Sequence, residues 1–294
     1  MPVDTLTSTE AVECGRIDSH HHLWRYAPKQ FPWMTEELAV LRRDFLVPDL
    51  VAVARESQIS GTIVVQARHS IEETSWLLEL AAGSQLLRGV VGWAPLANAD
   101  VLPTLELLAS HPRMKGVRHI LHDEMDEAYM LGKDFNHGVS YLRDLNLVYD
   151  LLIFERHLPS AIEFVDRHPQ QVFVLDHIGK PQIGNKSMEP WKSDIRKLAQ
   201  RDNVYCKVSG MVTEADWEKW CADDLRPYFE IVLEAFGPGR LMFASDWPVV
   251  TLAAPYRSWV SFVESETARL SSDEKMRIWH GTATHVYRLN QESG

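Results

Sequence analysis

Cysteine is scarce in this chain, with three residues, Cys14, Cys206 and Cys221, among 294. They form no CxxC pair or other metal-binding spacing, and an odd number suits a reducing compartment. No apolar run approaches the ~20 residues that cross a bilayer, and the opening segment lacks the basic-then-apolar pattern of a secretion signal. The sequence therefore predicts a soluble, cytoplasmic protein without membrane association.

Basic residues are also in deficit. Lysine and arginine number 30 against 41 aspartates and glutamates, which gives a net charge of −11. Because no basic cluster counters this excess, nucleic-acid binding is not expected. The 45% hydrophobic fraction suffices for one large core, and no internal repeat, low-complexity tract or linker divides the chain. We predict one domain with a small-molecule partner, and the sequence leaves the oligomeric state open.

Short β-branched and apolar runs alternate with amphipathic segments. Eight strands are predicted at 16–22, 61–67, 87–94, 114–120, 147–154, 171–177, 204–209 and 241–246. Helices are predicted at 50–58, 72–82, 102–110, 136–145, 159–167, 191–201, 225–236, 259–270 and 272–288. Eight alternating units favour parallel pairing and a closed barrel. The predicted fold class is α/β, a single (β/α)8 TIM-like barrel over 16–294 with C-terminal helices packed outside, after an N-terminal extension at 1–15.

A histidine triplet, His20, His21 and His22, ends the first predicted strand. Side chains alternate across a strand, so His20 and His22 share one face and His21 points the other way. The sixth predicted strand ends at His177 and the eighth at Asp246. Because functional side chains of such barrels lie at the C-terminal ends of the strands, these residues are expected to meet at one mouth. Three imidazoles and a carboxylate there predict a hydrolytic site.

Further polar and aromatic residues are expected around the mouth. Arg118 and His119 are neighbours on the fourth strand, so only one of them can face the mouth, and we expect it to be Arg118. Tryptophan offers a flat apolar face and one donor, which suits stacking against a substrate ring. The substrate-binding candidates are Trp24, Trp33, Gln66, Trp93, Glu155 and Lys180. Lys207 lies inside the seventh strand and needs a partner for its charge, and the sequence leaves its role and that of His157 open.

Four motifs in order carry a resemblance: DSHHHLW at 18–24, KGVRH at 115–119, LDHIGKP at 175–181 and FASDWP at 243–248. Together they resemble the amidohydrolase superfamily, and within it the amidohydrolase-2-like branch of sugar-lactone and pyrone-lactone hydrolases. The L-fuconolactonase group is the nearest likeness. The resemblance extends from residue 16 to about residue 289, essentially the whole predicted barrel.

The resemblance also implies a metal centre. In the superfamily, the strand-one histidine pair, histidines after strands five and six, and the aspartate after strand eight surround one or two metals. Here His20, His22 and Asp246, with His177 nearby, would hold one divalent ion, with zinc the expected metal. The fifth strand carries no histidine at its end, and Arg118 stands where binuclear members have a bridging lysine. The sequence is therefore compatible with a metal that is loosely held and not essential.

The function expected from these residues is the opening of a sugar lactone to the free sugar acid. Asp246 is the candidate general base that activates water, and His177 and Arg118 are candidates for polarising the carbonyl. The expected substrate is an aldonolactone, L-fuconolactone or a related sugar lactone, in carbohydrate catabolism.

Three alternatives stay open. A lactonase of the 2-pyrone-4,6-dicarboxylate type would need several arginines at the mouth, and Arg118 and Arg156 are available. A metal-dependent aromatic-acid decarboxylase of the same superfamily is disfavoured by the missing strand-five histidine. A catalytically inactive sugar-acid-binding protein is disfavoured because His20, His177 and Asp246 are all present.

Overall fold

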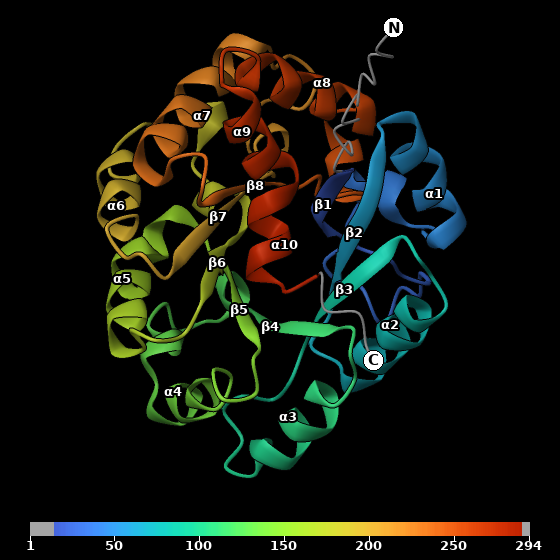
Figure 1. The fold of residues 1–294 in the computed structure, drawn as a ribbon, viewed down its shortest axis with the longest axis vertical. Helices are drawn as coiled ribbons and strands as arrows, with labels where there is room; N and C mark the ends of the chain where they lie inside the picture. The colour runs from blue at the N-terminus through green and yellow to red at the C-terminus, as the bar shows by residue number, and fades with distance from the viewer. Residues whose placement is uncertain (1–14, 290–294) are drawn as a thin grey trace, which may run out of the picture.

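The computed structural model describes residues 15–289, so the predicted N-terminal extension lies outside the described residues except for Gly15. Eight strands form one sheet in chain order, and each neighbouring pair is parallel. They are β1 (Arg16–His21), β2 (Ile59–Val65), β3 (Leu87–Gly92), β4 (Met114–Ile120), β5 (Val148–Leu152), β6 (Phe173–Leu175), β7 (Val204–Val208) and β8 (Leu241–Phe243). The predicted (β/α)8 barrel is confirmed (Figure 1).

Helices surround the strands on the outside of the barrel (Figure 1). They are α1 (Val47–Glu56), α2 (Ile71–Ala82), α3 (Val101–Ala109), α4 (Lys133–Ser140), α5 (Leu158–Arg167), α6 (Trp191–Leu198), α7 (Ala222–Phe236) and α8 (Tyr256–Thr267). Local signals start some of them: the Ser70 hydroxyl caps α2 by accepting from the backbone N–H of Glu73 at 3.1 Å. Within residues 15–289, no helix has the length and apolar character needed to cross a membrane.

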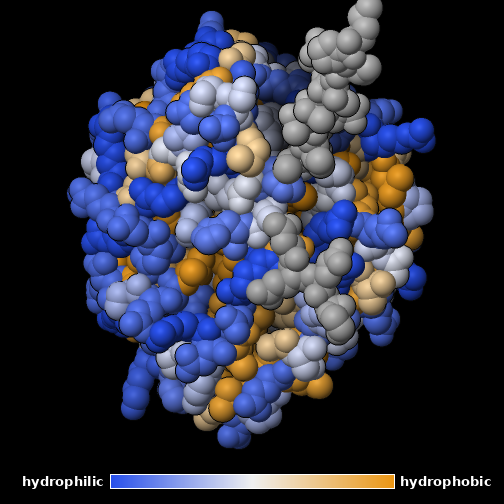
Figure 2. All heavy atoms as spheres, in the orientation of Figure 1, coloured by the Kyte–Doolittle hydropathy of each residue, from blue (hydrophilic) through white to orange (hydrophobic). Residues whose placement is uncertain are grey.

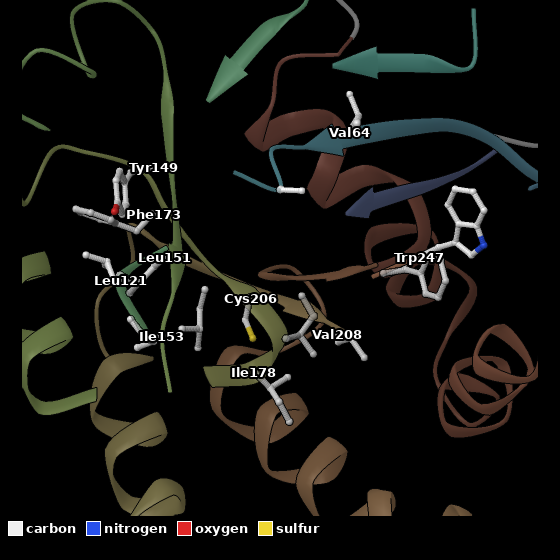
Figure 3. Close-up of a cluster of buried hydrophobic side chains, with 14 of the residues drawn as sticks. Val64, Leu121, Tyr149, Leu151, Ile153, Phe173, Ile178, Cys206, Val208 and Trp247 are labelled. Carbon is white, nitrogen blue, oxygen red and sulfur yellow. The ribbon is translucent and has the colours of Figure 1, made fainter. Parts of the chain in front are cut away.

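The core has two layers, because alternate residues of each strand face opposite sides of the barrel wall. The outer layer, drawn in Figure 3, includes Tyr149 and Leu151 of β5 beside Phe173 of β6. The inner layer takes the alternate residues, Val148 of β5 and Val174 of β6. The same alternation therefore packs the helices onto the wall and fills the barrel interior.

Seven of the eight strands end one to three residues earlier than predicted, and for β6 and β8 the difference affects the site. β6 ends at Leu175 and β8 at Phe243, whereas the predicted strands continue to His177 and Asp246. The φ angles of His177 and Asp246 are 53° and 58°, in the left-handed region that a strand does not contain. The predicted boundaries were wrong because apolar alternation does not reveal where the backbone changes direction. Both side chains consequently lie on the bends that follow the strands.

The last predicted helix, 272–288, is broken into three parts. They are α9 (Ser272–Met276), a π-helical turn (Arg277–Gly281) and α10 (Thr282–Val286). The apolar side of α10 packs against the inner layer through Ala283 and Val286, so α10 covers the end of the barrel where the strands begin (Figure 1). The same face in Figure 2 is mostly hydrophilic, with apolar side chains in small groups. This end is therefore closed, and the opposite end is left for a site.

Candidate active site and metal centre

The end of β1 presents two histidines to the mouth of the barrel. Nε2 of His20 lies 3.1 Å from Nε2 of His22. Between them, His21 is buried on the other side of the strand, where its Nε2 lies 3.0 Å from the hydroxyl of Thr62. The predicted alternation of the triplet is confirmed.

The second ring nitrogen of each mouth histidine already has a partner. Nδ1 of His22 lies 2.8 Å from the carbonyl oxygen of Val65, to which it can only donate. Nδ1 of His20 lies 3.3 Å from Oδ1 of Asp176. In the neutral form of His22 the proton is therefore assigned to Nδ1 and the lone pair to Nε2, which faces Nε2 of His20. A cation between the two Nε2 atoms would meet this lone pair.

Asp246 and His177 complete the cluster from the bends after β8 and β6. Oδ1 of Asp246 lies 3.3 Å from Nε2 of His22 and 3.8 Å from Nε2 of both His20 and His177. Nδ1 of His177 lies 2.8 Å from the hydroxyl of Ser209. Burial alone would raise the pKa of Asp246, but the neighbouring imidazoles hold that pKa below its usual value. Burial lowers the pKa of His177 to about 4, so near pH 7 an ionised carboxylate faces neutral rings.

These residues fit one divalent metal. Ligand atoms on a tetrahedral zinc lie roughly 3.3 to 3.7 Å from one another, and the nitrogen and oxygen atoms of His20, His22 and Asp246 are spaced similarly, at 3.1 to 3.8 Å. At the end of β5, Leu152 lines the mouth where a further ligand would be needed. His157 does not replace it, because its Nδ1 accepts from the backbone N–H of Phe154 at 3.2 Å.

Several charged side chains are buried around His20. Nζ of Lys207 lies 2.9 Å from Oδ1 of Asp176 and 3.2 Å from Nδ1 of His20, and it also pairs with Asp150. The ammonium can only donate, and it lies within ion-pair distance of the carboxylates of Asp176 and Asp150. Arg118 donates to Asp176 at 3.0 Å. The partner that Lys207 required is thus a pair of buried carboxylates.

The buried charges do not balance. Around His20, three buried carboxylates stand against two buried cations, an excess of one negative charge near pH 7; they are Asp150, Asp176 and Asp246 against Arg118 and Lys207. Isolated buried charge is costly, and a bound cation would offset this excess. Arg118 Nη1 also lies 3.3 Å from Nε2 of His20, so a cation already stands beside one ligand atom. A divalent metal is supported, and this arginine works against holding it tightly.

Asp18 ties β1 to the chain that follows β8. Its carboxylate accepts from the backbone N–H and the hydroxyl of Ser245 at 2.8 and 2.6 Å, and from the hydroxyl of Tyr256 at 2.9 Å. Burial raises the pKa of Asp18 to about 6, and these hydrogen bonds act against that rise. The backbone N–H of Asp246 donates to the carbonyl of His20 at 2.8 Å. Asp18 therefore fixes the register of the two segments that carry the site.

A second group of ligand-type residues, His69, His119 and Glu124, lies beside the mouth. Nε2 of His119 lies 2.6 Å from Glu124, and Nδ1 of His119 accepts from the indole N–H of Trp93 at 3.3 Å. Nε2 of His69 accepts from the backbone N–H of Ile120 at 2.9 Å. Because these nitrogens already have partners, the group is a hydrogen-bond network and not a second metal centre.

A cavity of about 220 Å³ opens at the mouth. The predicted site residues that line it are His22, Trp24, Trp33, Arg118, His177, Lys180 and Asp246. His20 lies just beneath them, fully buried and in contact with His22 and Arg118. The structure thus brings the predicted catalytic and metal-binding residues together at one cavity, and their roles stay predictions.

Three predicted substrate-binding residues do not line the cavity. Gln66 donates to the backbone carbonyl of Arg118 at 3.2 Å, and Glu155 accepts from the side chain of Gln182 at 2.6 Å. Trp93 donates to His119, as described above. Each of the three therefore uses at least one polar group within the protein, and position after a strand was not enough to place them at the cavity.

Two more cavity residues are His122, which the sequence places in the loop after the fourth strand without assigning it a role, and Asp123, which was not selected. They lie in the short 3-10 turn (Leu121–Asp123) that directly follows β4. The available signal was their place in that loop, four and five residues after Arg118. Asp176, at the end of the sixth predicted strand, and Asp18 were likewise given no role, because a carboxylate behind a histidine has no sequence pattern of its own.

Comparison with known proteins agrees with this geometry. The amidohydrolase family matches residues 17–289. An L-fucono-1,5-lactonase of Burkholderia multivorans is 41% identical over 285 residues, which cover 93% of this chain and 96% of that protein. An L-fucono-1,5-lactonase of Burkholderia ambifaria is 34% identical and covers 95% and 97%. A crystal structure of a Burkholderia multivorans amidohydrolase with bound zinc superposes with a TM-score of 0.89 at 39% identity, covering 93% of this chain and 99% of that one.

Proposed function

The chain belongs to the amidohydrolase family, and from that premise we propose that it hydrolyses a sugar lactone to the free sugar acid. The observation that carries the proposal is the convergence of His20, His22 and His177 on Asp246 at the edge of one cavity. Such a site provides a base, hydrogen-bond donors and a cation position within a few ångströms, which are the requirements of acyl transfer to water.

Asp246 acts as the general base. Its carboxylate is ionised near pH 7, because neighbouring imidazoles hold its pKa below the usual value despite burial. It lines the cavity, so water bound there can lose its proton to Asp246 as the oxygen attacks the lactone carbonyl. The same carboxyl then returns the proton to the ring oxygen that leaves, and the sugar acid is released.

Arg118 and His177 stabilise the oxyanion that forms on the carbonyl. Both line the cavity, and Arg118 is held in place by Asp176 and by the backbone carbonyl of Gln66. Donors that are fixed before the reaction contribute a few kcal/mol each to transition-state binding, on the order of 3 kcal/mol for a single oxyanion donor. The hydrogen bonds from Arg118 to these acceptors therefore fix its guanidinium where negative charge develops in the transition state.

Zinc is the proposed metal, held by His20, His22 and Asp246, because imidazole and carboxylate ligands suit it and the relative cited above binds it. When bound, the ion polarises the carbonyl and lowers the pKa of water. We expect catalysis to continue after the metal is removed, because the guanidinium of Arg118 lies against His20 and supplies a positive charge at the site. The metal is therefore proposed as an aid and not as a requirement.

L-Fucono-1,5-lactone or a related aldonolactone is the proposed substrate, because the two named relatives are L-fucono-1,5-lactonases. The cavity wall combines the indoles of Trp24 and Trp33 with polar groups, which suits a hydroxylated ring. A pyrone dicarboxylate is less well matched: Arg156 pairs with Glu127 outside the cavity lining. We place the reaction in sugar catabolism in the cytoplasm.

A lactone panel tests the proposal. Purified protein, with zinc added or with a chelator, is mixed with several aldonolactones and a pyrone dicarboxylate in a weak buffer containing a pH indicator. We expect acid release from one or more aldonolactones in both conditions. Acid release from the pyrone alone, or from none of the lactones in either condition, would overturn the proposed function.

A further inference from the structure

His122 is a cavity residue that the proposed reaction does not use. Its ring packs against Phe154, with ring centroids 4.6 Å apart, and lines the same cavity as Asp246. Its side chain is 18% exposed, so it is neither core nor free surface. The neighbouring Asp123 and Lys180 line the same part of the wall.

Neither ring nitrogen of His122 has a hydrogen bond within the described part of the chain. Nδ1 is enclosed and without a partner. Nε2 lies 3.7 Å from Oδ1 of Asp123, which is too long for a hydrogen bond. The other buried histidines described here, including His20, His22 and His177, each have at least one partner. An unpaired polar group at a cavity is costly unless a ligand supplies the partner.

The imidazole is neutral over the working range of pH. Burial, together with the positive charges of Lys180 and Arg118, lowers the pKa of His122 to about 2. A neutral imidazole has one donor and one acceptor, so it can donate to or accept from a hydroxyl, and it brings no positive charge to attract a carboxylate. Lys180 adds little free positive charge, because it forms an ion pair with Glu214. This side of the cavity therefore suits an uncharged, hydroxylated ring.

We infer that His122 is a substrate-binding residue whose Nε2 hydrogen-bonds a ring hydroxyl of the lactone and so selects hydroxylated over unsubstituted or carboxylated lactones. The inference rests on the proposed lactonase function and adds a specificity residue to it. Asp246 and His177 act on the attacking water and the reacting carbonyl, whereas His122 binds a substituent of the ring.

The test compares two substrates in three forms of the protein. KM and kcat are measured for an aldono-1,5-lactone, and for δ-valerolactone, which has no hydroxyls, with wild type, His122→Phe and His122→Gln. We expect His122→Phe to raise KM for the aldonolactone about tenfold, the loss of one hydrogen bond, and His122→Gln to recover part of it. The kinetic constants for δ-valerolactone, or its inhibition constant if it is not turned over, should stay within about twofold.

Equal effects on both substrates, or no effect of His122→Phe on the aldonolactone, would overturn the inference. The control is His137→Phe on the exposed side of α4, where no change is expected, and the unfolding temperature checks that each variant is folded. If wild type hydrolyses neither lactone, the function proposal fails separately. In that case the affinity for the open aldonate is measured by tryptophan fluorescence, to which Trp24 and Trp33 of the cavity contribute. Only a weaker affinity in His122→Phe then supports the role of His122.

Discussion

Two clusters at the same end of the barrel contain histidines and a carboxylate within ligand distance, yet they differ in what their nitrogens can do. In the first cluster, Nδ1 of His22 donates to an internal carbonyl and Nδ1 of His20 lies beside Asp176, so Nε2 of each ring faces the other ring and Asp246. In the second cluster, both nitrogens of His119 and Nε2 of His69 already have partners.

The difference teaches that proximity of ligand-type residues does not make a metal or catalytic site. The groups behind the rings decide, because they fix which nitrogen carries the proton. The carboxylates differ in the same way: Asp246 is buried among several imidazoles, whereas Glu124 is partly exposed and bonds one ring. Four experiments test this contrast, in order of decreasing effect.

The largest effect is expected from Asp246→Asn. Removing the base should lower kcat for the lactone about a thousandfold, within the range that general bases contribute. The matched control is Glu124→Gln in the second cluster, for which kcat should change by less than about twofold, because Glu124 is not part of the cavity lining. Near wild-type turnover in Asp246→Asn would show that another group activates the water.

Asp18→Ala tests what holds the first cluster together. The change removes the acceptor of the Tyr256 hydroxyl and of the backbone N–H groups of Ser245 and His20 in a buried place, so the free energy of unfolding should fall by about 3 kcal/mol. Glu124→Ala is the control and should cost at most about 1 kcal/mol, because His119 can turn to water. Urea unfolding of both variants makes the comparison, and equal losses would contradict it.

Metal affinity should differ between variants of the two clusters. Wild type is expected to bind one zinc ion per chain, and His20→Asn or His22→Asn should weaken binding by about a hundredfold or more. His69→Asn and His119→Asn should leave stoichiometry and affinity unchanged, because their nitrogens are used within the protein. Competition with a coloured chelator measures both quantities. If wild type binds a second ion and His69→Asn does not, then His69, His119 and Glu124 bind metal and the contrast is wrong.

The smallest effect concerns pH. Burial lowers the pKa of His119 to about 4 even though Glu124 lies 2.6 Å from Nε2. The folded ring therefore stays neutral while the unfolded chain takes up a proton near pH 6.5, and stability is lost as the pH falls from about 6.5 towards 4. Between about pH 6.5 and 5 this group should account for roughly 1 to 2 kcal/mol. His119→Phe should flatten the stability curve by that amount, and an unchanged slope would refute the assignment.

Much of the fold could be predicted because hydrophobic periodicity is a local property. The runs at 87–94 and 114–120 correspond closely to β3 and β4, and the alternation of helices and strands indicated the barrel. The ends of β6 and β8 could not be predicted, because positive φ at His177 and Asp246 is not a local pattern; the backbone N–H of Asp246, for example, donates to the carbonyl of His20 in β1. Likewise, the break between α9 and α10 occurs where the last helix meets the barrel end.

The sequence by itself determined that His20 and His22 share a face, that His21 does not, and that Asp246 follows the last strand. These points depend only on the two-residue period of a strand and on chain order. The tertiary structure alone decided which histidines are available for chemistry. That outcome depends on groups distant in sequence, such as Asp176 beside His20, because the partner of one ring nitrogen decides whether the other nitrogen carries the proton.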